Sequence, residues 1–183
     1  MPDLKAPEDR LFVAIAQQVA LVRVEGRGSF KISTPLKQFV LAAIEGGAQT
    51  AVVDLGQCAS MDSTFMGVLA GAAGRLKSRN AGRLVLVNLS AKTRALIATL
   101  GLDQVVAAYD AGSVPAEFAD FAGATMNQVS SGGESKRTTT ETMLEAHEML
   151  TSIAPDNVPR FKDVLEFLRE DLKRRPENNG LAP

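Results

Sequence analysis

The sequence predicts an α/β fold: a single mixed β-sheet with helices packed on it, followed by a C-terminal helical hairpin. Two continuous apolar runs of strand length, at 51–55 and 83–89, are typical of strands buried on both faces. Apolar residues recur at helical spacing between the strands, and glycines end these helical patterns. Strands that alternate with helices run parallel, and a strand pair at the start makes the sheet mixed.

The order of apolar runs and glycine stops defines each element in turn. A strand pair comes first, and helices and strands then alternate up to a last short strand. The expected elements are strands at 11–16 and 19–24, a helix around 36–44, a strand at 51–55, a helix at 65–76, a strand at 83–89, a helix at 91–100 and a strand at 105–106.

The composition changes after residue 110. We expect an α/β domain at 1–112, a linker rich in Ala, Gly, Ser and Thr at 113–140, an amphipathic helical hairpin at 141–175 and a disordered tail at 176–183. The hairpin half of the chain is mildly acidic and the α/β half mildly basic. Because two helices cannot bury their apolar stripes alone, the hairpin must dock on its own domain or pair with a second copy as a homodimer.

Composition also limits the classes of function. The net charge of −1 over 183 residues gives no general attraction to nucleic acid or to an anionic membrane. The one cysteine, Cys58, excludes an internal disulfide and fits a reducing compartment. The apolar run at 11–22 contains two glutamines and follows two acidic residues, so we expect a cytoplasmic protein without a secretory signal. No nucleotide-binding motif is present and His147 has no second metal ligand at usable spacing, so no cofactor or metal is expected.

The most informative motif is Asp62-Ser63-Thr64, which follows an apolar strand and opens an apolar helix. In the simplest interpretation, Asp62 or Ser63 caps the helix, which is worth about 1 kcal/mol. In a second, Ser63 accepts a phosphoryl group, whose added charge of roughly −1.5 to −2 stops a partner from binding. In a third, Ser63 is a hydrolase nucleophile; against this, His147 is the only histidine, it lies beyond the linker, and no Gly-x-Ser-x-Gly elbow is present.

The residues from Val52 to Leu55, followed by Met61-Asp62-Ser63-Thr64 and then Gly67 and Leu69, resemble the signature of STAS domains, the anti-sigma factor antagonists. The resemblance covers about residues 10–110. It implies that a GHKL-type serine kinase, which is also an anti-sigma factor, phosphorylates Ser63 and that a PP2C-type phosphatase reverses this. The unphosphorylated form would bind the kinase.

The resemblance also implies a partner surface around the serine. Phe65 stands where the family often has a small residue, so we expect it to reshape that surface. The predicted partner-binding residues are Asp54, Asp62, Ser63, Thr64 and Phe65.

Two other classes of function stay open. One is a constitutive structural subunit or scaffold in which Ser63 is only a helix cap; the other, more distant, is an enzyme. The hairpin has three candidate roles: a dimer contact, a lid over the Ser63 surface or a second binding module. The spacing of Gly67, Gly71 and Gly74 predicts close packing of their helix on the sheet.

Overall fold

The computed structural model describes residues 8–175 and confirms the predicted α/β fold with a mixed sheet. The sheet has six strands in the order β5-β4-β3-β2-β1-β6. The strand β1 is antiparallel to both of its neighbours, and all other neighbouring strands are parallel. The strands are β1 (Arg10–Ala16), β2 (Val19–Gly28), β3 (Thr50–Met61), β4 (Arg83–Leu89), β5 (Ala107–Asp110) and β6 (Asn127–Val129).

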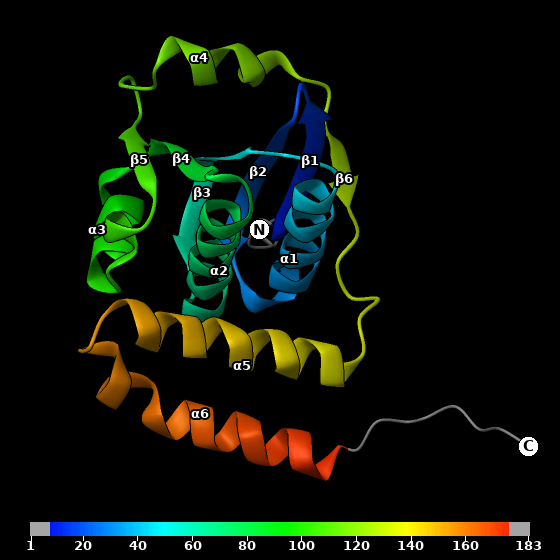
Figure 1. Ribbon diagram of the computed structural model, residues 1–183, viewed down its shortest axis with the longest axis vertical. Helices are drawn as coiled ribbons and strands as arrows, with labels where there is room; N and C mark the ends of the chain where they lie inside the picture. The colour runs from blue at the N-terminus through cyan, green and yellow to red at the C-terminus, as the bar shows by residue number, and fades with distance from the viewer. Residues whose placement is uncertain (1–7, 176–183) are drawn as a thin grey trace, which may run out of the picture.

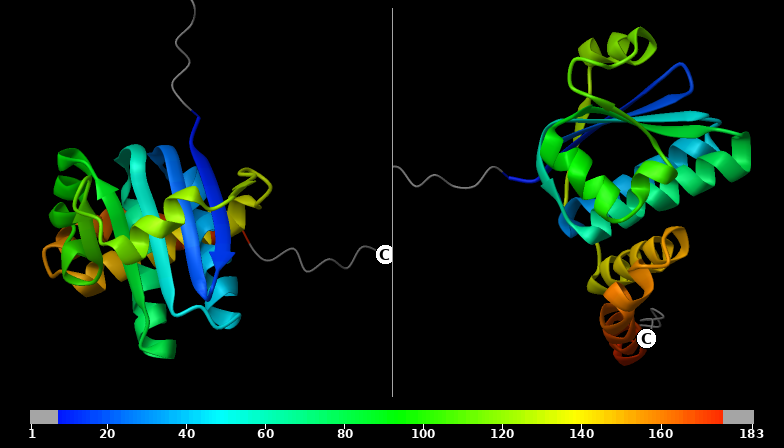
Figure 2. Two further views of the ribbon diagram at one scale, coloured as in Figure 1. Left: turned by 90° about the horizontal axis from the view of Figure 1, so that it is seen from above. Right: turned by 90° about the vertical axis from the view of Figure 1, so that its left-hand side faces the viewer.

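The helices form layers on both sides of the sheet (Figure 1). Figure 2 shows α1, α2 and α3 on one face of the sheet, α5 beneath them and α6 beneath α5, while α4 crosses the opposite face. The helices are α1 (Phe30–Glu45), α2 (Ser63–Asn80), α3 (Ala91–Thr99), α4 (Ala116–Ala119), α5 (Lys136–Ile153) and α6 (Asn157–Arg174), with 3₁₀ turns η1 (Leu102–Gln104) and η2 (Asp120–Gly123).

Alternate residues of the central strands face two separate cores. Val53 lies in the core between the sheet and the long helices, whereas its neighbour Val52 packs with Phe118 of α4 on the other face. Burial on both faces explains why these strands read as continuous apolar runs. Leu150 of α5 and Phe161 of α6 belong to the first core, so the hairpin docks on its own domain, one of the two arrangements that its apolar stripes predict.

The structure corrects several predicted boundaries. The expected linker at 113–140 contains α4, η2, β6 and the first turn of α5. The strand expected at 51–55 continues to Met61, and the strand expected at 105–106 forms two residues later, because Val105 and Val106 belong to the turn that follows η1. The predicted tail at 176–183 lies outside the described residues. Within residues 8–175, no helix is both long and apolar enough to cross a membrane.

Candidate functional site

Asp62 joins the amino-terminal ends of two helices. It is the N-cap of α2 in extended conformation, and its Oδ1 accepts a hydrogen bond from the Phe65 amide at 2.9 Å. Its Oδ2 accepts from the Phe30 amide, at the first residue of α1, at 2.8 Å. The Asp62 amide donates to the Gly28 carbonyl at 2.9 Å, which links the ends of β2 and β3. The cap is therefore Asp62, and the interpretation of Ser63 as the cap is wrong.

The Ser63 hydroxyl instead contacts the C-terminal hairpin. Its Oγ lies 2.9 Å from Nε2 of His147, a residue of α5 that is 84 positions further along the chain. Ser63 is half-buried, whereas His147 is only 3% exposed and lies edge-on to the Phe161 ring at 5.0 Å between centroids. The docked hairpin therefore lies directly against the predicted phosphorylation site.

The second ring nitrogen of His147 fixes the direction of this hydrogen bond. Its Nδ1 lies 2.7 Å from the Met143 carbonyl oxygen, which can only accept. Nδ1 must therefore carry the proton, and in the neutral ring Nε2 is left as an acceptor. The Ser63 hydroxyl donates to Nε2, so both polar atoms of this buried imidazole are satisfied.

One helical turn further along α2, the two backbones touch. An ideal Cβ on Gly67 would lie 2.3 Å from the Ala146 carbonyl oxygen and 2.7 Å from its Cβ. Ser63 and Gly67 are four residues apart and share one face of α2. The prediction that this glycine allows close packing on the sheet is wrong, because Gly67 contacts helix α5. Gly74 has no atom within 4 Å of an ideal Cβ.

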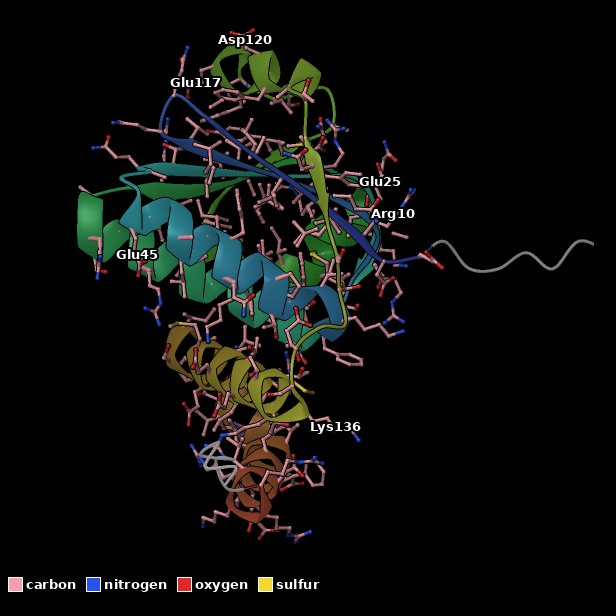
Figure 3. The ribbon with its side chains drawn as sticks, turned by 90° about the vertical axis from the view of Figure 1, so that its right-hand side faces the viewer. Arg10, Glu25, Glu45, Glu117, Asp120 and Lys136 are labelled. Atoms are coloured by element: carbon pink, nitrogen blue, oxygen red, sulfur yellow. The ribbon has the colours of Figure 1, made fainter. Side chains whose placement is uncertain are left out.

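Helix α1 supplies two further contacts to α5. The buried hydroxyls of Thr34 and Thr142 lie 3.1 Å apart. Lys37 Nζ forms an ion pair with Glu145 at 2.5 Å, and the Glu145 side chain is 53% exposed. Figure 3 shows α5 between the α1–α2 layer and α6, and Lys136 marks its first residue. We call the surface of Thr34, Lys37, Ser63 and Gly67 the α1–α2 face.

The remaining predicted partner-binding residues lie away from this face. Thr64 and Phe65 are 3% and 0% exposed, and the Phe65 ring packs beneath Gly28 in the core. The expectation that Phe65 reshapes a partner surface is therefore wrong for this conformation. The burial follows from helix geometry, because residues 64 and 65 point to other sides of α2 than Ser63.

Asp54 is also separate from Ser63. It accepts hydrogen bonds from the Gly56 amide at 2.9 Å and from Asn88 Nδ2 at 3.0 Å, and pairs with Arg23 at 3.4 Å. With Arg23 and Asn88 it borders a cavity of about 130 Å³ beneath α4, on the sheet face opposite the long helices. The structure brings Asp62 and Ser63 together and leaves Asp54 elsewhere.

The position of His147 beyond the predicted linker was one argument against a hydrolase. The structure removes this argument, because His147 does reach Ser63. Nucleophile and base are within hydrogen-bond distance. However, a backbone carbonyl orients the imidazole, both oxygens of Asp62 accept from amides, and His147 is 3% exposed. His147, the base of such a pair, is buried in helix packing rather than open to a substrate.

Comparison with known proteins identifies the α/β part of the chain. A family model described as "Mlab, STAS domain" matches residues 11–107, slightly more than half of the sequence. No curated protein matches the chain closely enough to count as a relative.

Several solved structures are similar to this chain, and one of them, with a TM-score above 0.5, supports the fold. The anti-sigma factor antagonist SpoIIAA in its unphosphorylated form is 21% identical, with 61% of this chain and 93% of that chain covered and a TM-score of 0.51. The phosphorylated form of the Bacillus SpoIIAA gives 21% identity, coverage of 61% and 96% and a TM-score of 0.48. A putative anti-sigma factor antagonist from Thermotoga maritima gives 21% identity, coverage of 54% and 84% and a TM-score of 0.49.

Proposed function

The chain belongs to the STAS-domain family, and on this premise we propose that it is a cytoplasmic partner-switching regulator of the anti-sigma factor antagonist type. In its unphosphorylated form it binds a GHKL-type serine kinase that acts as an anti-sigma factor. Phosphorylation of Ser63 ends this binding, and a PP2C-type phosphatase restores it. The protein itself needs no catalytic activity for this role.

The observation that carries the proposal is that the side chains of Asp62 and Ser63 make different contacts. Asp62 alone caps α2 and also binds the first amide of α1. The Ser63 hydroxyl is thereby left out of the capping geometry, half-buried at the first turn of the helix. A group added at this position changes a surface contact without removing a helix cap.

The local electrostatics fit a phosphate as a switch. The first turn of a helix has unpaired amides and a positive dipole end, which favour an anion. A phosphate next to the Asp62 carboxylate concentrates negative charge on the α1–α2 face, and a partner that covers this face must desolvate it. Each 1.4 kcal/mol of such a penalty weakens binding about tenfold.

A constitutive structural subunit is the second candidate. One observation favours it: the Ser63 hydroxyl already donates to His147 within the same chain, as a purely structural serine would. In this case the partners of the protein do not depend on the state of Ser63.

Paired capture from native lysate tests the proposal. Wild type, Ser63→Ala and Ser63→Glu serve as bait, and bound proteins are identified by mass spectrometry. A GHKL-type kinase retained by the first two and lost from Ser63→Glu supports a phosphorylation-gated switch. Ser78→Glu is the matched control, since it adds the same charge to an exposed position at the other end of α2. Identical partners on all four baits contradict the switch and favour the structural subunit.

A further inference from the structure

The hairpin α5–α6 occupies the face of the domain that carries Ser63. Within the domain it contacts α1 through Thr142 and Glu145, and α2 through Ala146 and His147. These four residues lie within two turns of α5, and they contact the four residues of the α1–α2 face. A partner that reads the Ser63 hydroxyl must therefore compete with α5 for the same surface.

At the centre of the contact between α2 and α5, Gly67 leaves room only for a helix with a small side chain at the facing position. Because Gly67 has no side chain, Ala146 approaches α2 to a distance that a Cβ on Gly67 or a side chain larger than alanine at position 146 would disturb. The contact continues toward Gly71 but is not completely filled. Gly71, Arg75 and Met149 are among the residues around a cavity of about 70 Å³ between α1, α2 and α5.

Polar groups at the edge of the contact define the charge and register of the occupying helix. Lys37 forms an ion pair with a carboxylate, Thr34 forms a hydrogen bond with a hydroxyl, and Ser63 donates a hydrogen bond to an acceptor. An ion pair as exposed as that of Lys37 and Glu145 contributes little to stability, so it sets the register more than it holds the helix. The packing beside Gly71 is thus incomplete and the edge contacts are weak, although displacement of α5 also uncovers Leu150, which is buried in the main core.

We propose that the α1–α2 face is a helix-binding surface that α5 occupies within the same chain and from which an external helix displaces it. The external helix has the chemistry of α5: a small residue opposite Gly67, an acceptor opposite Ser63 and a carboxylate opposite Lys37. The inference rests on the proposed function only for the claim that this partner senses phosphorylation of Ser63. Occupation by α5 keeps the chain unavailable until such a partner, or loss of the His147 contact, releases the hairpin.

The first experiment uses a substitution in α5 that undocks the hairpin and leaves the residues of the α1–α2 face unchanged. In full-length Ala146→Arg, the arginine cannot fit against Gly67, so α5 undocks. The probe is a fluorescent peptide of residues 134–175, and binding is measured by anisotropy. Ser152→Arg is the matched control, because Ser152 is an exposed residue of the same helix.

The expected result follows from effective concentration. A tethered hairpin competes at about millimolar concentration, so the peptide should bind Ala146→Arg about a hundredfold or more tighter than wild type or Ser152→Arg. Adding Gly67→Ala to Ala146→Arg should weaken peptide binding by about 5- to 150-fold, because the added Cβ then meets Ala146 of the peptide. Equal binding to wild type and Ala146→Arg overturns the proposal, and so does absence of binding to folded Ala146→Arg.

A reversible disulfide between α1 and α5 tests the proposal if Ala146→Arg does not fold. The Thr34 and Thr142 hydroxyls are 3.1 Å apart, so cysteines at both positions can form a disulfide after a small shift. Burial raises the pKa of the Cys58 thiol, which keeps it from exchanging with this bond. Oxidation should slow hydrogen exchange of the first-turn amides of α2 relative to the reduced form. Equal exchange in both forms means that α5 does not open, and the proposal is wrong.

These measurements separate the inference from the proposed function. None of them involves a kinase, so identical lysate partners for wild type and Ser63→Glu refute the switch without affecting them. Conversely, partner capture that depends on Ser63 in a protein that fails both tests here refutes the inference alone.

Discussion

The Ser63 hydroxyl donates a hydrogen bond to Nε2 of His147 across 2.9 Å, although 84 residues separate them in the chain. This bond joins the first turn of the helix that bears the predicted phosphorylation site to the hairpin that covers it. The proposed phosphorylation of Ser63 would replace the hydroxyl proton that His147 accepts, and so would change both the site and the contact that shields it. Each of the following predictions tests one part of this arrangement.

The hydrogen bond itself is measurable by a double-mutant cycle. Ser63→Ala removes the donor, and His147→Phe removes the acceptor while keeping an aromatic ring beside Phe161. We expect each single variant to lower the free energy of unfolding in urea by about 1–2 kcal/mol, with a coupling energy of about 1 kcal/mol. Effects that add within about 0.3 kcal/mol contradict a direct bond between the two side chains.

Two glycines of α2 should respond in opposite directions to the same substitution. Gly67→Ala places a Cβ against the Ala146 carbonyl and should lower the free energy of unfolding by about 1–3 kcal/mol, with faster hydrogen exchange in α5. Gly74→Ala gains helix propensity without a contact and should stabilise by about 0.5–1 kcal/mol. Similar changes from both variants would show that α5 does not pack on Gly67.

Asp62 offers a test of the double cap. Asp62→Ala removes the acceptors for both the Phe65 and the Phe30 amides and should cost about 2 kcal/mol of stability, since one cap is worth about 1. Asp62→Asn keeps one acceptor oxygen and replaces the other with an amide group that cannot accept, so about half of the loss should remain. Thermal and urea unfolding of the three proteins compare the values; equal stability of Asp62→Asn and wild type argues against the bond to Phe30.

Sequence patterns predicted the central elements because local signals and burial agree there. The continuous apolar runs of β3 and β4 identify strands buried on both faces, and the motif around Asp62 identifies a helix start. The strand β6 was missed since its three residues carry no alternating pattern, and it forms only by pairing with the edge strand β1. Tertiary pairing overrides a weak local signal in such a segment.

The same distinction explains what was found and missed at the site. Ser63 and Asp62 are adjacent and follow a recognisable strand-to-helix pattern, so the sequence alone identifies them. His147 reaches Ser63 only because the hairpin folds back over α2, and no local pattern encodes that distance. The available signals were indirect: His147 shares a helix face with the apolar Ala146 and Leu150, and a glycine lies one turn after Ser63.

The buried thiol should make stability fall at high pH. Burial raises the pKa of Cys58 in the folded protein above 9.0, the ordinary value for a thiol, and hydrogen bonds from the Gly28 and Ser60 backbone oppose this in part. The unfolded chain therefore loses this proton first, so the contribution of Cys58 to the free energy of unfolding is complete below pH 9 and declines as the pH rises toward the folded pKa.

Urea unfolding of wild type and Cys58→Ala between about pH 7 and 10.5 isolates the effect. The difference in free energy of unfolding between the two proteins should shrink above about pH 9, because other titrating groups are common to both and cancel. A difference that stays constant across the range would mean that the thiolate is tolerated in the fold and that Cys58 is not held neutral by burial.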